Sequence, residues 1–227
     1  MTIITCSVQK TLWLAPNIMG LTCIRPDHYT FIAGQYAPLQ THDMPEARAY
    51  SIASSENGNT LNFHIRIAPH SPTAQSFKKL SSGDILNIYP AQGKNTLSKT
   101  QNGPLILIGG GVGIAPLYSI ILTALEQTPE RQITLFWGSD NIADLYLHNQ
   151  FISLAKTKDN FHYIPVCLFS ASGVAQGQVT DHIFHEPYIF ASASIHIAGP
   201  KEMMQHSLHL LEKQGVPETS IFYDKFW

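Results

Sequence analysis

The chain has 227 residues, of which 44% are hydrophobic, and its 14 lysine and arginine residues against 16 aspartate and glutamate residues leave a net charge of -2. This length and composition suit one large domain or two small ones with a packed core, and the lack of a basic run argues against nucleic acid or an anionic membrane as a partner. Because the start of the chain has no basic region followed by a long apolar stretch, and neither end carries a lipidation pattern, we expect a cytoplasmic protein.

Short strands separated by turn signals are predicted for the first hundred residues. Apolar residues occupy every second position of Leu61–Ile67, which is the pattern of a half-buried strand. The predicted strands are Ile3–Val8, Asn17–Cys23, Tyr36–Leu39, Tyr50–Ala53, Thr60–Ile67 and Ile85–Tyr89. One helix is expected at about Ala74–Leu80, before the turn residues Ser81-Ser82-Gly83-Asp84. We therefore predict a small antiparallel β-barrel domain over residues 1–97.

From Pro104 the pattern changes to strands that alternate with helices. Leu105–Ile108 is a continuous apolar run of the kind that forms a strand buried on both faces. The further predicted elements are strands at Ile133–Trp137, Tyr163–Leu168 and Ile195–Ala198 and helices at Pro116–Gln127, Leu145–Thr157 and Lys201–Gln214. Such alternation predicts a parallel sheet with helices on both faces, hence an α/β domain over residues 103–227. The polar segment Gln92–Gly103 is the expected linker and offers little to a core.

The cysteines and histidines give no sign of a metal site. Cys6, Cys23 and Cys167 are widely separated, which predicts buried thiols in a reducing compartment rather than disulfides. They are also too few and too scattered to hold an iron–sulfur cluster. The 11 histidines have no cysteine or carboxylate partner at a recognised spacing, so no metal is predicted.

A glycine-rich turn joins the first strand and the first helix of the second half. Gly109–Gly111 and Gly113 permit positive φ and close backbone approach, and Pro116 suits the first turn of a helix. A helix that begins here directs free N–H groups at the turn, where a pyrophosphate can bind. Alone, the turn fits a nucleotide site and a purely structural connection equally well. The glycines, the proline and the lack of basic flanks argue against a membrane span over Leu105–Leu125.

A second motif, Arg48-Ala49-Tyr50-Ser51, enters a barrel strand. Side chains two residues apart project from the same face of a strand, which would present Arg48 and Tyr50 together while Ser51 contributes a hydroxyl. A flat ring system with a phosphate tail could use the aromatic ring for stacking, the guanidinium for the phosphate and the hydroxyl for a ring nitrogen. In isolation, such a short match is more typical of an edge-strand arginine beside a core tyrosine.

Together these motifs resemble the ferredoxin–NADP reductase superfamily. The resemblance rests on Arg48–Ser51, on Ala33–Tyr36 before it, on Gly110–Pro116 and on Ala198-Gly199-Pro200, and it runs in register over nearly the whole chain. Within that superfamily, the chain is most similar to NAD(P)H:flavin oxidoreductases in its length, in its lack of an iron–sulfur cluster domain and in its C-terminal residues.

The resemblance implies a role for each motif residue. The flavin site would be formed by the motif Arg48-Ala49-Tyr50-Ser51. In it, Arg48 would bind the flavin phosphate or ribityl chain, and Tyr50 would pack against the isoalloxazine. Ser51 would hydrogen-bond N5, the hydride acceptor. The other flavin contacts would come from the backbone of His64, Ile65 and Arg66, from the hydroxyl of Ser76 and from the ring of Trp227. The nicotinamide cofactor would be bound by Gly110, Gly111, Val112, Gly113 and Pro116 and, beside the nicotinamide, by Gly199 and Pro200.

Three departures from the family motifs qualify this assignment. Thr73–Ser76 keeps the serine but lacks the glycine of a motif that binds an FAD pyrophosphate, which argues against tight FAD binding. Ala198 stands where many members have a cysteine, so catalysis would not depend on a thiol. Val112 replaces a frequent threonine and removes one hydroxyl contact to the cofactor phosphates.

The activity that the resemblance implies is hydride transfer from NADH or NADPH to the N5 atom of FMN, FAD or riboflavin, with release of reduced flavin to a flavin-dependent monooxygenase or a ferric acceptor. One alternative is a reductase that retains FAD and passes electrons to a partner protein such as an oxygenase. An alternative of another class is a dinucleotide-binding subunit without turnover. Gly138–Asn141 and Phe169–Ser172, where a 2′-phosphate would bind, contain no cation, which favours NADH.

Overall fold

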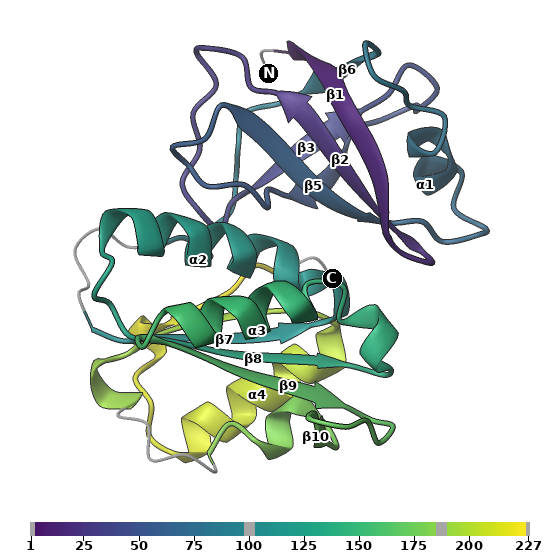
Figure 1. Ribbon diagram of the computed structural model, residues 1–227. Coiled ribbons are helices and arrows are strands. Elements are labelled where there is room, and N and C mark those ends of the chain that lie inside the picture. The colour runs from purple at the N-terminus through teal and green to yellow at the C-terminus, as the bar shows by residue number, and fades with distance from the viewer. Residues whose placement is uncertain (1–2, 98–102, 185–189, 226–227) are drawn as a thin grey trace.

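The computed structural model describes residues 3–97, 103–184 and 190–225, and these form two stacked domains (Figure 1). The N-terminal domain is a six-stranded antiparallel sheet, and the C-terminal domain is a six-stranded parallel sheet with helices on both faces. Both architectures confirm the fold predicted from the sequence.

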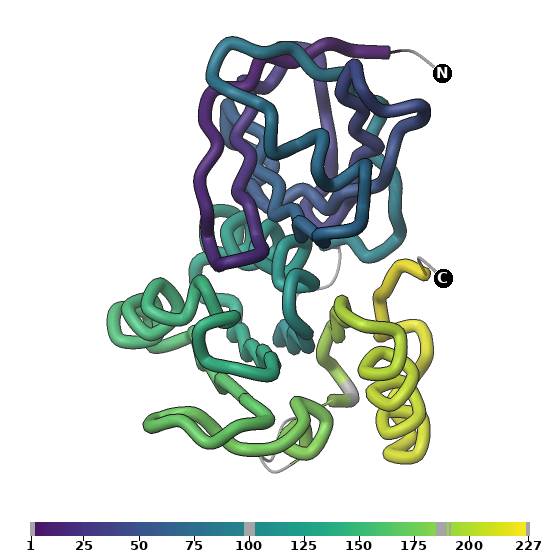
Figure 2. The backbone as a smooth tube through the Cα atoms, turned by 90° about the vertical axis from the view of Figure 1, so that its right-hand side faces the viewer, coloured from purple at the N-terminus to yellow at the C-terminus, as the bar shows by residue number. Residues whose placement is uncertain are grey.

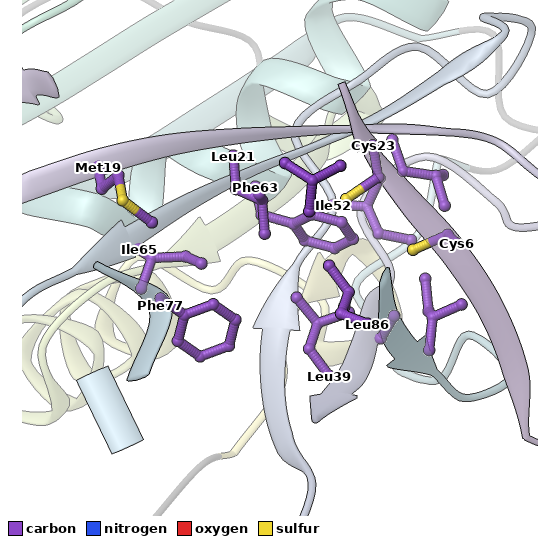
Figure 3. Packing of buried hydrophobic residues seen from close by; sticks show 14 of the residues in the cluster. Cys6, Met19, Leu21, Cys23, Leu39, Ile52, Phe63, Ile65, Phe77 and Leu86 are labelled. Carbon is purple, nitrogen blue, oxygen red and sulfur yellow. The ribbon is translucent and has the colours of Figure 1, made fainter. Parts of the chain in front are cut away.

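The N-terminal sheet closes on itself to form a barrel. Its strands are β1 (Ile4–Ala15), β2 (Ile18–Ile24), β3 (Tyr36–Gln40), β4 (Arg48–Ser51), β5 (Thr60–Arg66) and β6 (Ile85–Ile88), in the order β4-β3-β6-β1-β2-β5. The two edges meet where Ile52, directly after β4, forms an antiparallel bridge with Phe63 of β5. Figure 3 shows Phe63 and Ile65 packed with Phe77 inside the barrel. Because side chains alternate along a strand, His64 and Arg66 of β5 face away from this core.

The barrel differs from the predicted elements at β4, which spans Arg48–Ser51 rather than Tyr50–Ala53, and more strongly at β1 and α1. β1 extends to Ala15, well beyond the predicted end at Val8, because its second half pairs with β2 in a hairpin. The helix α1 (Pro72–Phe77) begins before the predicted Ala74, since the Ser71 hydroxyl caps it by accepting a hydrogen bond of 3.2 Å from the Ala74 N–H. A serine followed by a proline is a helix-start signal that the prediction overlooked.

The C-terminal domain is a three-layer α/β fold. Its strands are β7 (Leu105–Gly110), β8 (Ile133–Ser139), β9 (Phe161–Cys167), β10 (Ala175–Gln176), β11 (Ser194–Ala198) and β12 (Ile221–Phe222), in the order β10-β9-β8-β7-β11-β12. The helices α2 (Ile114–Gln127) and α3 (His148–Thr157) cover one face and α4 (Lys201–Lys213) the other (Figure 1). Leu107 of β7 packs in the cluster with α2 and α3, whereas Ile108 packs in the cluster with α4. Because both faces of β7 are buried, its sequence is an uninterrupted apolar run.

Several short elements complete this domain. Five 3-10 helices are present among the described residues, at η1 (Gly111–Gly113), η2 (Ile142–Asp144), η3 (Val179–Asp181), η4 (Phe190–Ser192) and η5 (Glu218–Ser220). The η2 turn occupies part of the approach to α3, so that helix begins at His148 rather than at the predicted Leu145. None of the described helices combines the length and the apolar character that a membrane crossing requires. All three cysteines are buried free thiols, as predicted.

The segment between the domains contributes more to the packing than predicted. Leu97 is buried in the cluster formed by β7, α2 and α3, and its N–H donates a hydrogen bond of 2.9 Å to the carbonyl of Ala33 in the barrel. Asn95 is buried as well, and its Nδ2 donates to the carbonyl of Ile197 on β11 at 3.2 Å. The expectation that Gln92–Gly103 offers little to a core is therefore wrong, because one leucine and one amide anchor this polar segment on both domains.

The helix α2 fixes the placement of the two domains, because it runs along their boundary (Figures 1 and 2). Polar side chains on its barrel-facing side recur at helical spacing. Ser119 donates a hydrogen bond of 2.6 Å to the carbonyl of Ser54, and the Thr123 hydroxyl accepts one of 3.1 Å from the N–H of Glu56. One turn further, Glu126 accepts from the amide of Asn57 at 3.1 Å. The first turn of α2 is thereby held at a fixed position relative to the barrel.

Candidate functional site

A cavity of about 440 Å³ lies between the two domains, and it is called the interdomain cavity here. Its barrel wall consists of Gly34, Ala49, Tyr50, Ser51, His64 and Arg66. Its α/β wall consists of Gly110, Val112, Gly113, Ala115, Pro116, Ile197, Ala198, Gly199, Pro200 and Met204. Asn95 and Asp224 complete the lining. Two motifs that are far apart in the sequence thus face one space.

The end of β4 supplies an aromatic ring and a hydroxyl to the barrel wall. The ring of Tyr50 packs edge-on against Phe77, with centroids 5.0 Å apart and an interplanar angle of 73°. Burial raises the pKa of the Tyr50 hydroxyl, which therefore stays protonated at neutral pH. Ser51 follows in the cavity lining and is half-buried. The barrel wall thus presents a ring of fixed orientation next to a hydroxyl.

Arg48 lies outside this cavity, although the alternation of side chains places it and Tyr50 on one face. Its Nη2 is 2.6 Å from the carboxylate of Glu46, and 57% of its side chain is exposed. An exposed ion pair of this kind contributes little free energy, so the guanidinium is easily released toward a ligand. Binding of a flavin phosphate by Arg48 remains a prediction.

The strand β5 contributes His64 and Arg66 to the barrel wall of the interdomain cavity, while Ile65 between them faces the barrel core. Ile65 points into the barrel core (Figure 3) and pairs with Met19 of β2, so its side chain is not part of the cavity. Arg66 faces outward, and its Nη2 lies 3.1 Å from the position that a Cβ on Gly111 would occupy. Burial lowers the pKa of His64 to about 4, so its imidazole is neutral at neutral pH.

The glycines of the turn after β7 permit an unusually close approach of three elements. A Cβ on Gly113 would lie 2.7 Å from Cα of Gly199, and a Cβ on Gly110 would lie 2.8 Å from Cδ of Pro200. Gly111 has a φ of +52°, a conformation that side chains rarely adopt. The end of β7, the start of α2 and the end of β11 meet here because none of these positions carries a side chain.

The start of α2 is open to a ligand. No side chain among the described residues caps this helix. The N–H of Ile114 donates to the carbonyls of Gly111 and Val112, so the turn η1 leads directly into α2 and the positive end of the helix lies at this turn. Pro116 lies within that turn, as the sequence predicts, where its missing N–H costs no hydrogen bond. Free N–H groups and the positive end of the helix dipole favour an anion, so this wall fits a phosphate group. The close-packed glycines and the start of the helix therefore border the cavity together.

A second cavity of about 470 Å³ continues along the carboxyl ends of β7, β8 and β9, and it is called the sheet-edge cavity here. It shares Arg66, Gly110 and Pro200 with the interdomain cavity. Its other lining residues are Gly111, Gly138, Ser139, Asp140, Asp144, Leu168, Gly177, Gln178, Val179, Glu202, Met203 and His206. This position outside the carboxyl ends of parallel strands is where open α/β sheets bind their ligands.

Two further predicted residues are not brought to either cavity by the described structure. Ser76 is buried within α1, where its hydroxyl donates to the carbonyl of Pro72 at 3.2 Å. Trp227 lies outside the described residues. The prediction missed Asp224, whose carboxylate accepts a hydrogen bond of 2.7 Å from the N–H of Lys94. Figure 2 shows that the C-terminal tail rises toward the barrel, a path that no local sequence signal indicates.

Comparison with known proteins places this geometry among reductases. The family described as the oxidoreductase NAD-binding domain matches residues 107–209. The chain is 29% identical over 218 residues to the reductase component of propane 2-monooxygenase from Rhodococcus jostii, across 92% of this chain and 59% of that protein. It is 27% identical to a probable flavin reductase from Vibrio harveyi, across 97% of this chain and 98% of that protein.

A solved structure shows the same arrangement of both domains. The crystal structure of a cytochrome P450 reductase from Amycolatopsis matches with a TM-score of 0.91 and 26% identity, and the match covers 99% of this chain and 70% of that one. The chain spans 59% of the Rhodococcus reductase component and 62% of the corresponding protein from Mycolicibacterium smegmatis. These relatives are therefore longer proteins, whereas the Vibrio protein is matched over nearly its whole length.

Proposed function

Because this chain belongs to the ferredoxin–NADP reductase superfamily, we propose that it is an NAD(P)H:flavin oxidoreductase, in which the nicotinamide supplies a hydride and the flavin accepts it at N5. The observation that carries this proposal is the interdomain cavity, which is lined by Tyr50 and Ser51 from the barrel and by Gly113 and Gly199 from the α/β domain. Two cofactors that react with each other need one shared space, and these walls border one.

The residues of the barrel wall bind and orient the flavin. Tyr50 offers a flat ring whose tilt is fixed by Phe77, so it restricts the flavin ring to one plane. The Ser51 hydroxyl donates a hydrogen bond to N5 and is half-buried, which shields that bond from competing water. Arg48, held only by an exposed ion pair, turns toward the flavin phosphate or ribityl chain.

The residues of the α/β wall bind the nicotinamide cofactor. The uncapped first turn of α2 and the turn at Gly110–Gly113 receive the pyrophosphate, and Gly199 with Pro200 borders the nicotinamide. Arg66 lines both cavities beside Gly111 and adds a positive charge where the phosphates would pass from one cavity to the other. No acid or base is required of the protein, because a hydride transfer moves no separate proton.

The sheet-edge cavity supports NADH as the preferred donor. Asp140, Asp144 and Glu202 line this cavity, so a 2′-phosphate bound there would meet like charges. The permanently charged cation on its lining is Arg66, at the end shared with the interdomain cavity. Carboxylates near a ribose favour a free 2′-hydroxyl over a phosphate.

A second candidate function is a reductase that retains FAD and passes electrons to an oxygenase. The name of the Rhodococcus relative supports it, since that protein is a reductase component of a monooxygenase. The position of Ser76 favours the free-flavin function instead. Its hydroxyl is engaged within α1 and does not line the interdomain cavity, so the remaining serine of the FAD pyrophosphate motif is not poised for that contact.

The experiment that separates these functions is an oxidation assay on protein purified without added flavin. A colourless protein that oxidises NADH only when FMN, FAD or riboflavin is supplied would support the free-flavin function. Stoichiometric bound FAD would support the FAD-retaining function. Binding of NADH without any flavin-dependent oxidation would favour the non-catalytic dinucleotide-binding subunit and would contradict both.

A further inference from the structure

A hydrogen bond crosses from one domain to the other at the wall of the interdomain cavity. The hydroxyl of Tyr146, between η2 and α3, lies 3.0 Å from Nδ1 of His64 on β5. The imidazole is also stacked against Tyr118 of α2, with centroids 6.3 Å apart and an interplanar angle of 27°. It meets the ring of Tyr146 edge-on at 5.3 Å. A barrel side chain that lines the cavity is therefore enclosed by two rings of the α/β domain.

Tyr146 is itself held by the glycine-rich turn. Its ring packs edge-on against Trp137 of β8, with centroids 5.4 Å apart and an interplanar angle of 87°. The Nε1 of Trp137 donates a hydrogen bond of 2.9 Å to the carbonyl of Gly111. Two rigid aromatic side chains thus connect the turn of the dinucleotide site to His64 in the barrel wall.

The hydrogen bond couples the tautomer of His64 to the orientation of the Tyr146 hydroxyl. Burial lowers the pKa of His64 to about 4 and raises the pKa of the Tyr146 hydroxyl, so both groups are neutral at neutral pH. Within the described part of the chain His64 is the only hydrogen-bond partner of that hydroxyl, which can donate to Nδ1 or accept from it; in the arrangement proposed below it donates. The imidazole proton then sits on Nε2, the nitrogen that Tyr146 leaves free.

We propose that Tyr146 is a positioning residue for the flavin site, which holds His64 so that its Nε2–H donates a hydrogen bond to an acceptor atom of the bound flavin. The inference rests on the proposed function and adds a side chain of the α/β domain to the flavin site. Because the bond crosses the boundary, His64 is oriented only while the two domains are docked. A directed N–H donor at the flavin ring stabilises the reduced form, which carries more negative charge, over the oxidised form.

The test compares two tyrosines that differ in location but not in chemistry. Tyr146→Phe removes the hydroxyl that holds His64. Tyr163→Phe is the matched control, because the Tyr163 hydroxyl lies 3.2 Å from Nδ1 of His148 within the α/β domain and lines neither cavity. Burial raises the pKa of both hydroxyls strongly, so the two substitutions remove comparably buried groups.

Two measurements that require no turnover provide the readout. Nitrogen NMR of protein labelled at histidine should show His64 as the Nε2–H form in the wild type and as a mixture of forms in Tyr146→Phe, with the His64 signal identified by its loss in His64→Gln. Binding of FMN or riboflavin, followed by quenching of flavin fluorescence, should weaken roughly 5- to 10-fold in Tyr146→Phe and stay unchanged in Tyr163→Phe.

Several outcomes would overturn the inference. Unchanged tautomer and flavin affinity in Tyr146→Phe would do so, as would an equal loss of affinity in Tyr163→Phe. If Tyr146→Phe does not fold, His64→Gln, which keeps an N–H donor near the Nε2 position, should bind flavin better than His64→Leu, and equal binding by these two variants would contradict the inference. A wild-type protein that binds neither FMN nor riboflavin would instead overturn the proposed function.

Discussion

Replacement of Gly113 by alanine should damage the dinucleotide site through sterics alone. Gly113 has a φ of -61°, so an alanine can adopt its backbone conformation. Its Cβ, however, would lie 2.5 Å from the carbonyl carbon of Ala198 and 2.7 Å from Cα of Gly199, where ordinary contact begins at 3.4 Å. Since both neighbours are backbone atoms, the start of α2 and the end of β11 must separate by about 1 Å.

The expected magnitude follows from this separation. Overpacking of a tight core contact costs about 1 to 3 kcal/mol, so the free energy of unfolding of Gly113→Ala should fall by that amount. Displacement of a cofactor-binding wall by about 1 Å should reduce kcat/KM for NADH on the order of 100-fold. Steady-state NADH oxidation with added FMN measures the second effect, and denaturant unfolding followed by circular dichroism measures the first.

Gly58→Ala is the matched control for this substitution. A Cβ on Gly58 would lie 3.4 Å from the carbonyl oxygen of Ser55, which is ordinary contact, and this glycine borders neither cavity. Its kcat/KM should stay within about 2-fold of wild type. A Gly113→Ala variant with wild-type kcat/KM for NADH would refute the argument that the close approach of α2 and β11 builds the dinucleotide site.

Three further predictions concern the chemistry of the site and the stability of the fold. Ser51→Ala should lower kcat about 10-fold with little change in the KM for flavin, because its hydrogen bond serves the transition state; an unchanged kcat would remove Ser51 from the mechanism. At equal concentrations NADH should give a kcat/KM at least about 10-fold above that of NADPH. Asp140→Asn should lower this ratio in the same steady-state assay, because it removes one of the carboxylates that repel a 2′-phosphate. A preference for NADPH would contradict the role of the carboxylates. The free energy of unfolding should fall as the pH drops from about 6.5 to about 4, since unfolded His64 binds a proton that its folded form, with a pKa of about 4, does not. Urea titrations across that range should show a loss of which His64 accounts for on the order of 3 kcal/mol, and His64→Gln should remove that part.

The buried histidine on β11 contributes to the same pH dependence. Burial, assisted by the charge of Arg131, lowers the pKa of His196 to about 3. Its Nδ1 lies 2.8 Å from Oδ1 of Asn95, and its ring stacks on Phe222. The pH dependence that remains in His64→Gln should therefore come in part from His196.

The elements with a clear pattern could be predicted from the sequence because a single local rule decides them. The alternation in β5 and the continuous apolar run of β7 each follow from the number of faces that the strand buries. The glycines at Gly110–Gly113 likewise report a backbone constraint that only glycine meets. Such features carry their structural cause within a few residues.

The features that the sequence did not reveal depend on contacts between distant segments. Asp224 reaches Lys94 because β12 adds to the edge of the parallel sheet, and a strand of two residues leaves no periodic signal. The bond between His64 and Tyr146 depends on how the barrel docks on α2, which no local pattern encodes. Leu97 is a single apolar residue in a polar segment, so its burial became visible only from the packing of both domains.

In the proposed reaction the interdomain cavity brings a nicotinamide and a flavin together for hydride transfer. This reaction is tested most directly by anaerobic mixing of the protein and FMN with NADH that carries deuterium at the transferred position of C4. The yellow absorbance of oxidised flavin should disappear as an equal amount of NADH is oxidised, and deuterium should slow this step. If NADH binds and the flavin stays oxidised, this cavity does not carry out hydride transfer to flavin.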